Sequence, residues 1–293
     1  MTGQISYGNF YVIETRKMKY WKQWFHMISE EGWTAYDRSV RELYPHWNGS
    51  HLAVALDEKD NHFLGCFVWC ENDGIAAMDA YNVIKDAQGR GVGAALWDYT
   101  MNRTVPKNLT KAMRSLPERV DRYMKLGWSC KGPVQYEIDC STVELKEACT
   151  SLLRPLRVQE FTELTFITFH SLSDHQRKAL FEFDTKVTGR NRRKLWEHLL
   201  RLEDLRGGVV VDSKDRVVSL CLIVETFDDK LLRVAPLYGE NLEMAMIGLI
   251  KAIDSLNDST NSKRFHKSLQ QVQVNECTLL WADYQNNHLK EEL

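Results

Sequence analysis

Three glycines stand at alternate positions near the end of the first third of the chain, in the stretch Gln-Gly-Arg-Gly-Val-Gly-Ala at residues 88–94. Glycine loses more conformational entropy on folding than any other residue, so this cluster indicates a backbone that bends sharply or lies against another group. An apolar run precedes the glycines, and a run with helical spacing follows them. A glycine loop that opens a helix presents several backbone N–H groups at the positive end of the helix dipole. The stretch therefore has the chemistry of an anion site, for example a phosphate site.

Two common phosphate loops do not fit the surrounding sequence. Gly89, Gly91 and Ala94 satisfy the dinucleotide spacing G-x-G-x-x-G/A, but that motif follows the first strand of a βαβ unit, and here an antiparallel hairpin is predicted before it. The GxxxxGK loop is excluded because no Lys-Ser or Lys-Thr pair follows the last glycine. What remains is a glycine cradle between an antiparallel meander and a helix. A tight strand-to-helix turn that binds nothing is the alternative.

Composition limits the class of protein. The 293 residues, 44% hydrophobic and 27% charged, suffice for two domains. The net charge of −2 predicts no nucleic-acid partner. No apolar run approaches a membrane span and the first residues do not resemble a secretion signal, so we expect a soluble, cytoplasmic chain with no membrane partner. Seven cysteines without CxxC or zinc-ligand spacing predict reduced thiols and no metal.

The order of predicted elements repeats along the chain. In the first half, the apolar spacing predicts strands at residues 10–15, 51–56, 62–69, 74–84 and 134–139, of which the second and third form a hairpin. It predicts helices at residues 18–33, 35–44, 91–103 and 116–128. After a looser stretch the same order begins again at residue 163 and ends with a helix at 240–256. We expect an α/β (α+β) chain of two tandem domains, each a mixed, mostly antiparallel sheet flanked by helices. The predicted ranges are an N-terminal domain at 1–140, a linker at 141–157 and a diverged C-terminal domain at 158–293.

Two motifs resemble those of the GNAT superfamily of N-acetyltransferases. Gln88 begins a match to the R/Q-x-x-G-x-G/A motif, and Arg-Tyr-Met-Lys-Leu-Gly-Trp at 122–128 resembles a second signature of the superfamily. Further stretches at 30–33, 183–196 and 233–245 are similar to tandem GNAT proteins of the YitH/HolE type. The chain departs from these relatives at Lys85, where they usually have proline.

The resemblance implies acetyl-CoA as co-substrate, bound without a metal. It assigns the pyrophosphate to the cradle and the pantetheine arm to the preceding strand, and so predicts as cofactor-binding residues Tyr81, Val83, Gln88, Gly89, Arg90, Gly91, Val92, Gly93 and Ala94.

Two residues are catalytic candidates. Tyr123 stands where many GNAT enzymes hold a tyrosine near the thioester sulfur, so its hydroxyl could protonate the departing thiolate; a buried core tyrosine is the alternative. Strand alternation is expected to place Asp79 on the same face as Tyr81 and Val83. Its carboxylate could then take a proton from the acceptor ammonium, directly or through water. An ordinary exposed strand acid is the alternative.

The acceptor site is predicted less sharply. Glu31 and Trp33 come from the helix pair that covers the acceptor cleft in GNAT folds, although a helix end packed by the tryptophan explains them equally well. Asp184 and Arg192 fit either a clasp on the acceptor or an ion pair between helices.

The corresponding junction of the second half keeps only one glycine, Gly239. Pro236, Leu237 and Tyr238 stand where the first half has the cradle, and proline has no N–H to donate. We therefore expect one coenzyme per chain and a second domain that shapes the acceptor site.

Three function classes follow. The first is an N-acetyltransferase that acts on the primary amine of a small molecule by direct transfer in a ternary complex. The alternatives are a protein N-acetyltransferase and a non-catalytic acyl-CoA sensor.

Overall fold

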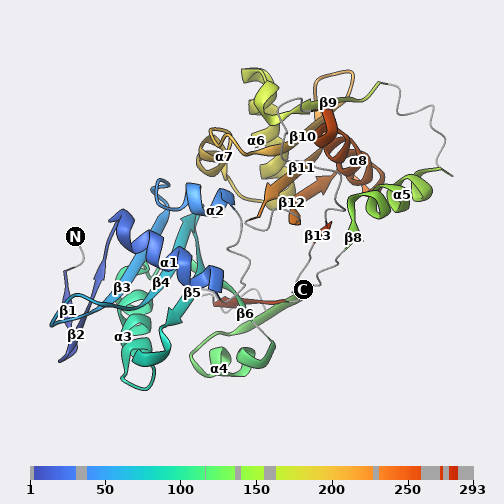
Figure 1. Ribbon diagram of the computed structural model, residues 1–293. Helices are drawn as coiled ribbons and strands as arrows, with labels where there is room; N and C mark the ends of the chain where they lie inside the picture. Colours follow the sequence, from blue (N-terminus) through green and yellow to red (C-terminus); the bar gives the residue numbers. More distant parts are fainter. Residues whose placement is uncertain are drawn as a thin grey trace. The chain divides into compact units, whose positions relative to one another are not determined.

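The computed structural model describes residues 3–30, 38–115, 117–135, 140–154, 163–226, 231–258, 271–272 and 277–282. Its contacts divide the chain into two compact units (Figure 1). Unit 1 comprises residues 1–35, 44–136 and 275–293, and unit 2 comprises residues 36–43 and 137–274. The segment from residue 275 onward, which the sequence places in the second domain, is therefore grouped with the first.

Unit 1 is built on an eight-stranded sheet with the order β1-β2-β3-β4-β5-β6-β14-β7. Neighbouring strands are antiparallel except for β5 and β6, which are parallel. The strands are β1 Ile5–Ser6, β2 Phe10–Glu14, β3 Ser50–Asp57, β4 Phe63–Asn72, β5 Ile75–Val83, β6 Thr110–Ser115, β7 Cys130–Gln135 and β14 Cys277–Ala282.

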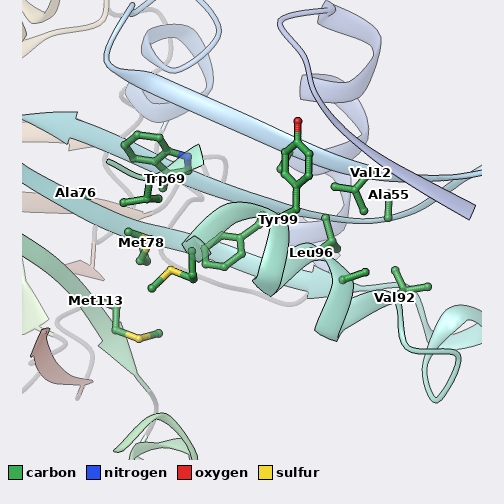
Figure 2. Close-up of a cluster of buried hydrophobic side chains, with 14 of the residues drawn as sticks. Val12, Ala55, Trp69, Ala76, Met78, Val92, Leu96, Tyr99 and Met113 are labelled. Carbon is green, nitrogen blue, oxygen red and sulfur yellow. The ribbon is translucent and has the colours of Figure 1, made fainter. Parts of the chain in front are cut away.

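Helices cover both faces of this sheet. Helix α1 (Met18–Glu30) buries a tryptophan-rich stripe, whereas α3 (Val92–Asp98) and the π-helix Tyr99–Thr104 pack on the other face together with Ala53 and Ala55 of β3. Figure 2 shows this second layer, with Val92 and Leu96 of α3 beside the strands. A 3-10 helix (Lys85–Ala87) precedes α3, and a second one (Pro117–Arg119) leads into α4, Val120–Lys125. The small alanines of β3 let α3 approach the sheet closely.

Unit 2 repeats this layout around a six-stranded sheet with the order β8-β13-β12-β11-β10-β9. The strand β9, the helix α6, the meander β10-β11-β12 and the helix α8 correspond in order to β2, the helix α1, the meander β3-β4-β5 and α3. This confirms two tandem copies, the second diverged. The bounds are α2 Arg38–Leu43, β8 Cys140–Ser141, α5 Thr142–Leu153, β9 Thr165–Thr168, the 3-10 helix Phe169–Ser171, α6 Asp174–Thr188, α7 Arg193–Leu199, β10 Arg206–Val211, β11 Val217–Glu225, β12 Leu231–Gly239, α8 Leu242–Asp258 and β13 Gln271–Val272.

The stretch expected as a linker contains a helix, α5. Its N-terminus is closed by a capping box, in which the Ser141 hydroxyl accepts from the Glu144 N–H at 3.1 Å and the Glu144 carboxylate accepts from the Ser141 N–H at 2.9 Å. The sequence Ser-Thr-Val-Glu carries the S-x-x-E signature of such a box, so this helix could have been predicted.

Three strands of unit 1, namely β1, β6 and β14, are not predicted from the sequence. In the structure β14 pairs antiparallel with both β6 and β7. A segment that follows the whole of unit 2 in the chain therefore completes the sheet of unit 1.

Candidate functional site

The three glycines of the loop have two different reasons to be glycine. Gly89 and Gly91 adopt φ of +76° and +82°, a region that other residues rarely tolerate, and a Cβ at either position would meet no atom within 4 Å. Gly93 has no such backbone constraint, but a Cβ there would lie 2.7 Å from the Tyr81 hydroxyl. The first two glycines therefore shape a turn beside open space, and the third makes room for Tyr81.

The turn ends at an uncapped helix. Gly91 is the N-cap of α3 and provides no side-chain cap, and the Ala95 N–H donates to the Gly91 carbonyl at 3.0 Å. The N–H groups of Gly91, Val92, Gly93 and Ala94 are the first four of the helix, so no carbonyl of the helix accepts a hydrogen bond from them. They also lie at the positive end of the helix dipole. The residues predicted for the cradle thus bring four such N–H groups to the space beside the glycines.

The other two loop residues hold the turn to neighbouring strands. The Gln88 side-chain amide donates to the Val83 carbonyl at 3.1 Å, which ties the start of the loop to the end of β5. The Arg90 guanidinium lies 3.4 Å from the Asp57 carboxylate on β3 and remains partly exposed. Gln88 is thus engaged in positioning the loop, while Arg90 leaves a cation at its rim.

An aromatic group connects the loop to Tyr123. The Tyr81 ring lies 5.1 Å from Phe67 and 5.6 Å from Trp97, and Trp97 stacks on Tyr123 at 5.7 Å. Burial raises the pKa of both tyrosine hydroxyls, and the neighbouring Arg122 only partly offsets this for each. Both tyrosines are half-buried and keep their protons at neutral pH. Trp97 was missed by sequence reasoning, although its spacing of four from Gly93 puts both on the helix face toward Tyr81.

The sheet opens beside this group. Strand β5 pairs with β6 only from Ile75 to Met78, and its remaining residues pair only with β4 among the described strands. Where the pairing with β6 ends, β5 contains a β-bulge: Asp79 and Ala80 together lie opposite one residue of β4. The edge of β5 from Asp79 to Val83 thus has no ladder toward β6, as expected for a strand that presents its backbone to a ligand.

The bulge corrects the expected position of Asp79. Tyr81 and Val83 pack toward α3, together with Met78, whereas Asp79 lies on the opposite face beside Tyr44. Simple alternation would have put Asp79 on the face of Tyr81, and this expectation is wrong because the extra residue of the bulge shifts the alternation by one.

The surroundings of Asp79 favour its neutral form. Its side chain reaches solvent but lies among dense protein atoms, and this desolvation raises the pKa of the carboxyl more than the Arg114 guanidinium and the hydrogen bond from Tyr44 lower it. The Tyr44 ring stacks on Trp24 at 5.7 Å. Tyr44 was missed because its contact with Asp79 arises only from the fold and leaves no local signal in the sequence.

Asp184 and Arg192 bind each other. Asp184 is 1% exposed, and both of its carboxylate oxygens accept hydrogen bonds from Arg192, one of them from Nε at 3.0 Å. The same guanidinium donates to the Tyr238 hydroxyl at 3.2 Å. Burial lowers the pKa of Arg192, but the bonds to Asp184 and Tyr238 outweigh it, so the net shift is upward. Glu31 and Trp33 lie outside the described residues.

The corresponding junction of unit 2 is closed. A Cβ at Gly239 would lie 2.4 Å from the Ala245 nitrogen, so this glycine packs against the first turn of α8. The Asn241 side chain accepts from the Met244 N–H at 2.9 Å and caps the helix. Helix α8 therefore lacks the open, uncapped start that α3 has.

Two further findings concern the described residues. No helix among them is both long and apolar enough to cross a bilayer. They also contain no group of three or more His, Cys, Asp or Glu side chains arranged to hold a metal ion.

Comparison with known proteins indicates the family of the first domain. Residues 18–128 match the sequence model of the acetyltransferase (GNAT) family. An uncharacterized protein of Caenorhabditis elegans is 28% identical over 232 residues, which are 78% of this chain and 71% of the relative.

Two solved structures share the fold over nearly the whole chain. A tandem GNAT protein from the clavulanic acid biosynthesis pathway is 11% identical with a TM-score of 0.59, covering 95% of this chain and 99% of that one. A putative acetyltransferase from Pyrococcus horikoshii is 13% identical with a TM-score of 0.61, covering 95% and 91%. Residues 18–128 are therefore a domain of the GNAT superfamily of acetyltransferases, and the chain has the tandem GNAT fold. The narrower resemblance to the YitH/HolE type stays a prediction.

Proposed function

We propose that the chain is an N-acetyltransferase that moves an acetyl group from acetyl-CoA to the primary amine of a small molecule, by direct transfer in a ternary complex. The observation that carries this proposal is the pair of left-handed glycines, Gly89 and Gly91, beside open space and before an uncapped helix. The match of residues 18–128 to an acetyltransferase family supports acyl transfer in general.

The loop supplies the binding energy for the phosphates. The N–H groups of Gly91, Val92, Gly93 and Ala94 would donate to the pyrophosphate, and Gly89 would let the chain turn without filling the cradle. Tyr81, Val83 and the unpaired edge of β5 would receive the pantetheine arm. When bound, acetyl-CoA supplies an activated acetyl thioester.

Asp79 and Tyr123 would move the two protons of the reaction. The pKa of the Asp79 carboxyl is raised toward neutral pH, so the carboxylate is a better base for a proton from the acceptor ammonium, taken directly or through water. Tyr44 would hold this carboxylate in place. The protonated hydroxyl of Tyr123 would donate to the departing sulfur. Asp79 directly follows Met78, the last residue of β5 that pairs with β6, and Tyr123 stacks on Trp97, which in turn contacts Tyr81 of β5.

Unit 2 would bind no second coenzyme. Its corresponding helix, α8, is capped by Asn241, and the first turn of α8 occupies the space beside Gly239. The ion pair of Asp184 with Arg192 would stabilise this unit rather than contact the acceptor.

The test is calorimetric titration of the full chain with acetyl-CoA, using two matched glycine variants. Gly74 lies in the β4–β5 turn with φ of +79° and open space around its Cβ position, so it reproduces the strain of Gly91 away from the loop. We expect Gly91→Glu to weaken binding more than tenfold, or about 1.4 kcal/mol, while Gly74→Glu leaves it unchanged. Equal affinities of the two variants would refute the cradle.

Release of coenzyme A separates an enzyme from a sensor. Wild-type protein incubated with acetyl-CoA and a panel of primary amines should release free thiol with at least one amine. Stabilisation by acetyl-CoA without thiol release from any small amine, peptide or protein would leave the sensor as the remaining function.

A further inference from the structure

A groove on unit 2 lies outside the candidate site. It runs between α6 and α7 and has a volume of about 460 Å³. Its α6 side is a stripe at helical spacing, and its α7 side is a second such stripe that extends just beyond the helix. The residues that carry the argument are Arg177, Lys178 and Phe181 from the first stripe and Arg193, Leu200 and Arg201 from the second.

The groove is basic although the chain is not. Four of its lining residues are Lys or Arg and two, Asp174 and Glu197, are acidic, whereas the whole chain has a net charge of −2. Within the part of the chain that the structure describes, the guanidinium groups of Arg177 and Arg201 make no ion pair. The sequence here includes Arg-Asn-Arg-Arg-Lys at 190–194, a short basic run that the overall composition conceals.

One of the cations is already held in place. The Arg193 guanidinium lies 5.7 Å from the centre of the Phe181 ring and 2.8 Å from the Glu197 carboxylate. A cation fixed by a ring and a carboxylate loses little side-chain entropy when it meets a ligand. Phe181 and Leu200 are half-buried and add apolar surface between the charges.

The shape and charge select the ligand. The α6 stripe spans eight residues, from 174 to 181, or roughly 10 Å of helix, which three or four extended peptide residues would match. Most of the lining side chains are exposed, so a small molecule in the groove would remain largely in solvent. Ordinary small-molecule sites instead bury most of the ligand surface. The carboxylates of Asp174 and Glu197 would repel a continuous phosphate backbone, whereas separate acidic side chains can avoid them.

We propose that this groove docks an acidic peptide segment of a partner protein, in which glutamate or aspartate flanks an apolar side chain. The acidic groups pair with Arg177 and Arg201, and the apolar side chain lies on Phe181 and Leu200. The inference is independent of acetyl transfer, because none of these residues belongs to the site of unit 1.

The experiment measures fluorescence anisotropy of a labelled Glu-Glu-Leu-Glu-Glu peptide with the full-length chain. The variant Arg177→Glu/Arg201→Glu is compared with Lys194→Glu/Lys251→Glu, which makes the same change of net charge at exposed positions that do not line the groove. We expect the groove variant to bind at least tenfold more weakly and the control to bind within twofold of wild type. A Gln-Gln-Leu-Gln-Gln peptide should bind at least tenfold more weakly than the acidic one.

Several outcomes would overturn the proposal. Equal weakening by both variants would mean nonspecific attraction by charge, and equal binding of the glutamine peptide would remove the role of the acids. No saturable binding of the acidic peptide, or tighter binding of a single-stranded oligonucleotide at the same site, would do so as well. Thermal unfolding of each variant, followed by circular dichroism in parallel, shows whether it is folded, and the melting temperature is expected to stay close to that of wild type.

Discussion

Replacement of Arg192 by methionine should destabilise unit 2 severely. Methionine keeps most of the aliphatic length but removes every donor, so the carboxylate of Asp184, which is 1% exposed, loses both of its arginine hydrogen bonds. Breaking a buried pair by removal of one partner costs about 3–5 kcal/mol, because a charge is left without compensation. For a unit of roughly 150 residues this corresponds to a melting temperature lower by roughly 9–15 °C.

The adjacent Arg193 provides the control for this measurement. It also makes an ion pair, with Glu197 at 2.8 Å, but the two side chains are 66% and 41% exposed. An exposed pair at this helical spacing contributes only about 0.3–0.5 kcal/mol and the exposed contact of Arg193 with the Phe181 ring about 0.5–1 kcal/mol, so Arg193→Met should lower the melting temperature by less than about 5 °C. Thermal unfolding followed by circular dichroism distinguishes the two variants directly.

A double variant identifies the cause. Asp184→Asn together with Arg192→Met removes the uncompensated charge, so it should recover part of the stability lost in Arg192→Met alone. A loss below 1 kcal/mol in Arg192→Met, accompanied by a large increase in KM for the amine, would refute the structural role and make the arginine part of an acceptor clasp.

Four further predictions concern Tyr123, Asp79 and the number of coenzymes per chain. Tyr123→Phe should lower kcat by about 10²–10⁴ while the Kd for acetyl-CoA changes little, because the hydroxyl acts only in the transition state; parallel losses in both would indicate packing instead. Asp79→Asn should slow transfer and abolish the acidic limb of the pH–rate profile, and a profile that retains this limb would assign it to another group. Because the folded state raises the pKa of Asp79, its ionised form destabilises the fold near pH 7. Asp79→Asn should therefore raise the melting temperature at pH 7, with a gain that vanishes as the pH falls to the unfolded-state pKa near about 3.9; a gain that is independent of pH would contradict this. Titration of the full chain should give one acetyl-CoA per chain, since α8 is capped by Asn241, and a stoichiometry near two would make the protein a double enzyme.

Features that depend on local sequence could be predicted. The glycine loop, the meander before it and the repeat of the whole layout follow from apolar spacing and from residues that only certain turns accept. The helix α5 was predictable as well, because its capping box lies within four residues from Ser141 to Glu144. The apolar residues of α5 do not follow a clear helical spacing, so the spacing alone does not predict this helix.

Features that depend on pairing between distant segments could not be predicted. The bulge at Asp79 arises because β5 must match the register of β4, and no residue at the bulge marks it. The close approach of Tyr81 to Gly93 likewise exists only once α3 lies on the sheet. Side-chain direction in a strand is therefore the first property that sequence reasoning loses.

The insertion of β14 between β6 and β7 links the folding of unit 1 to the synthesis of a segment that follows unit 2. Roughly 140 residues separate the end of β7 from the start of β14, and at about 5–20 residues per second their synthesis takes roughly 7–30 s. During this interval β6 and β7 have no strand between them, and each presents an open edge to other nascent chains. Any product that stops before residue 277 keeps these edges permanently. The arrangement makes the complete sheet of the cradle-bearing domain dependent on translation through the whole second domain, so we expect a truncated chain to expose these edges to chaperones and proteases.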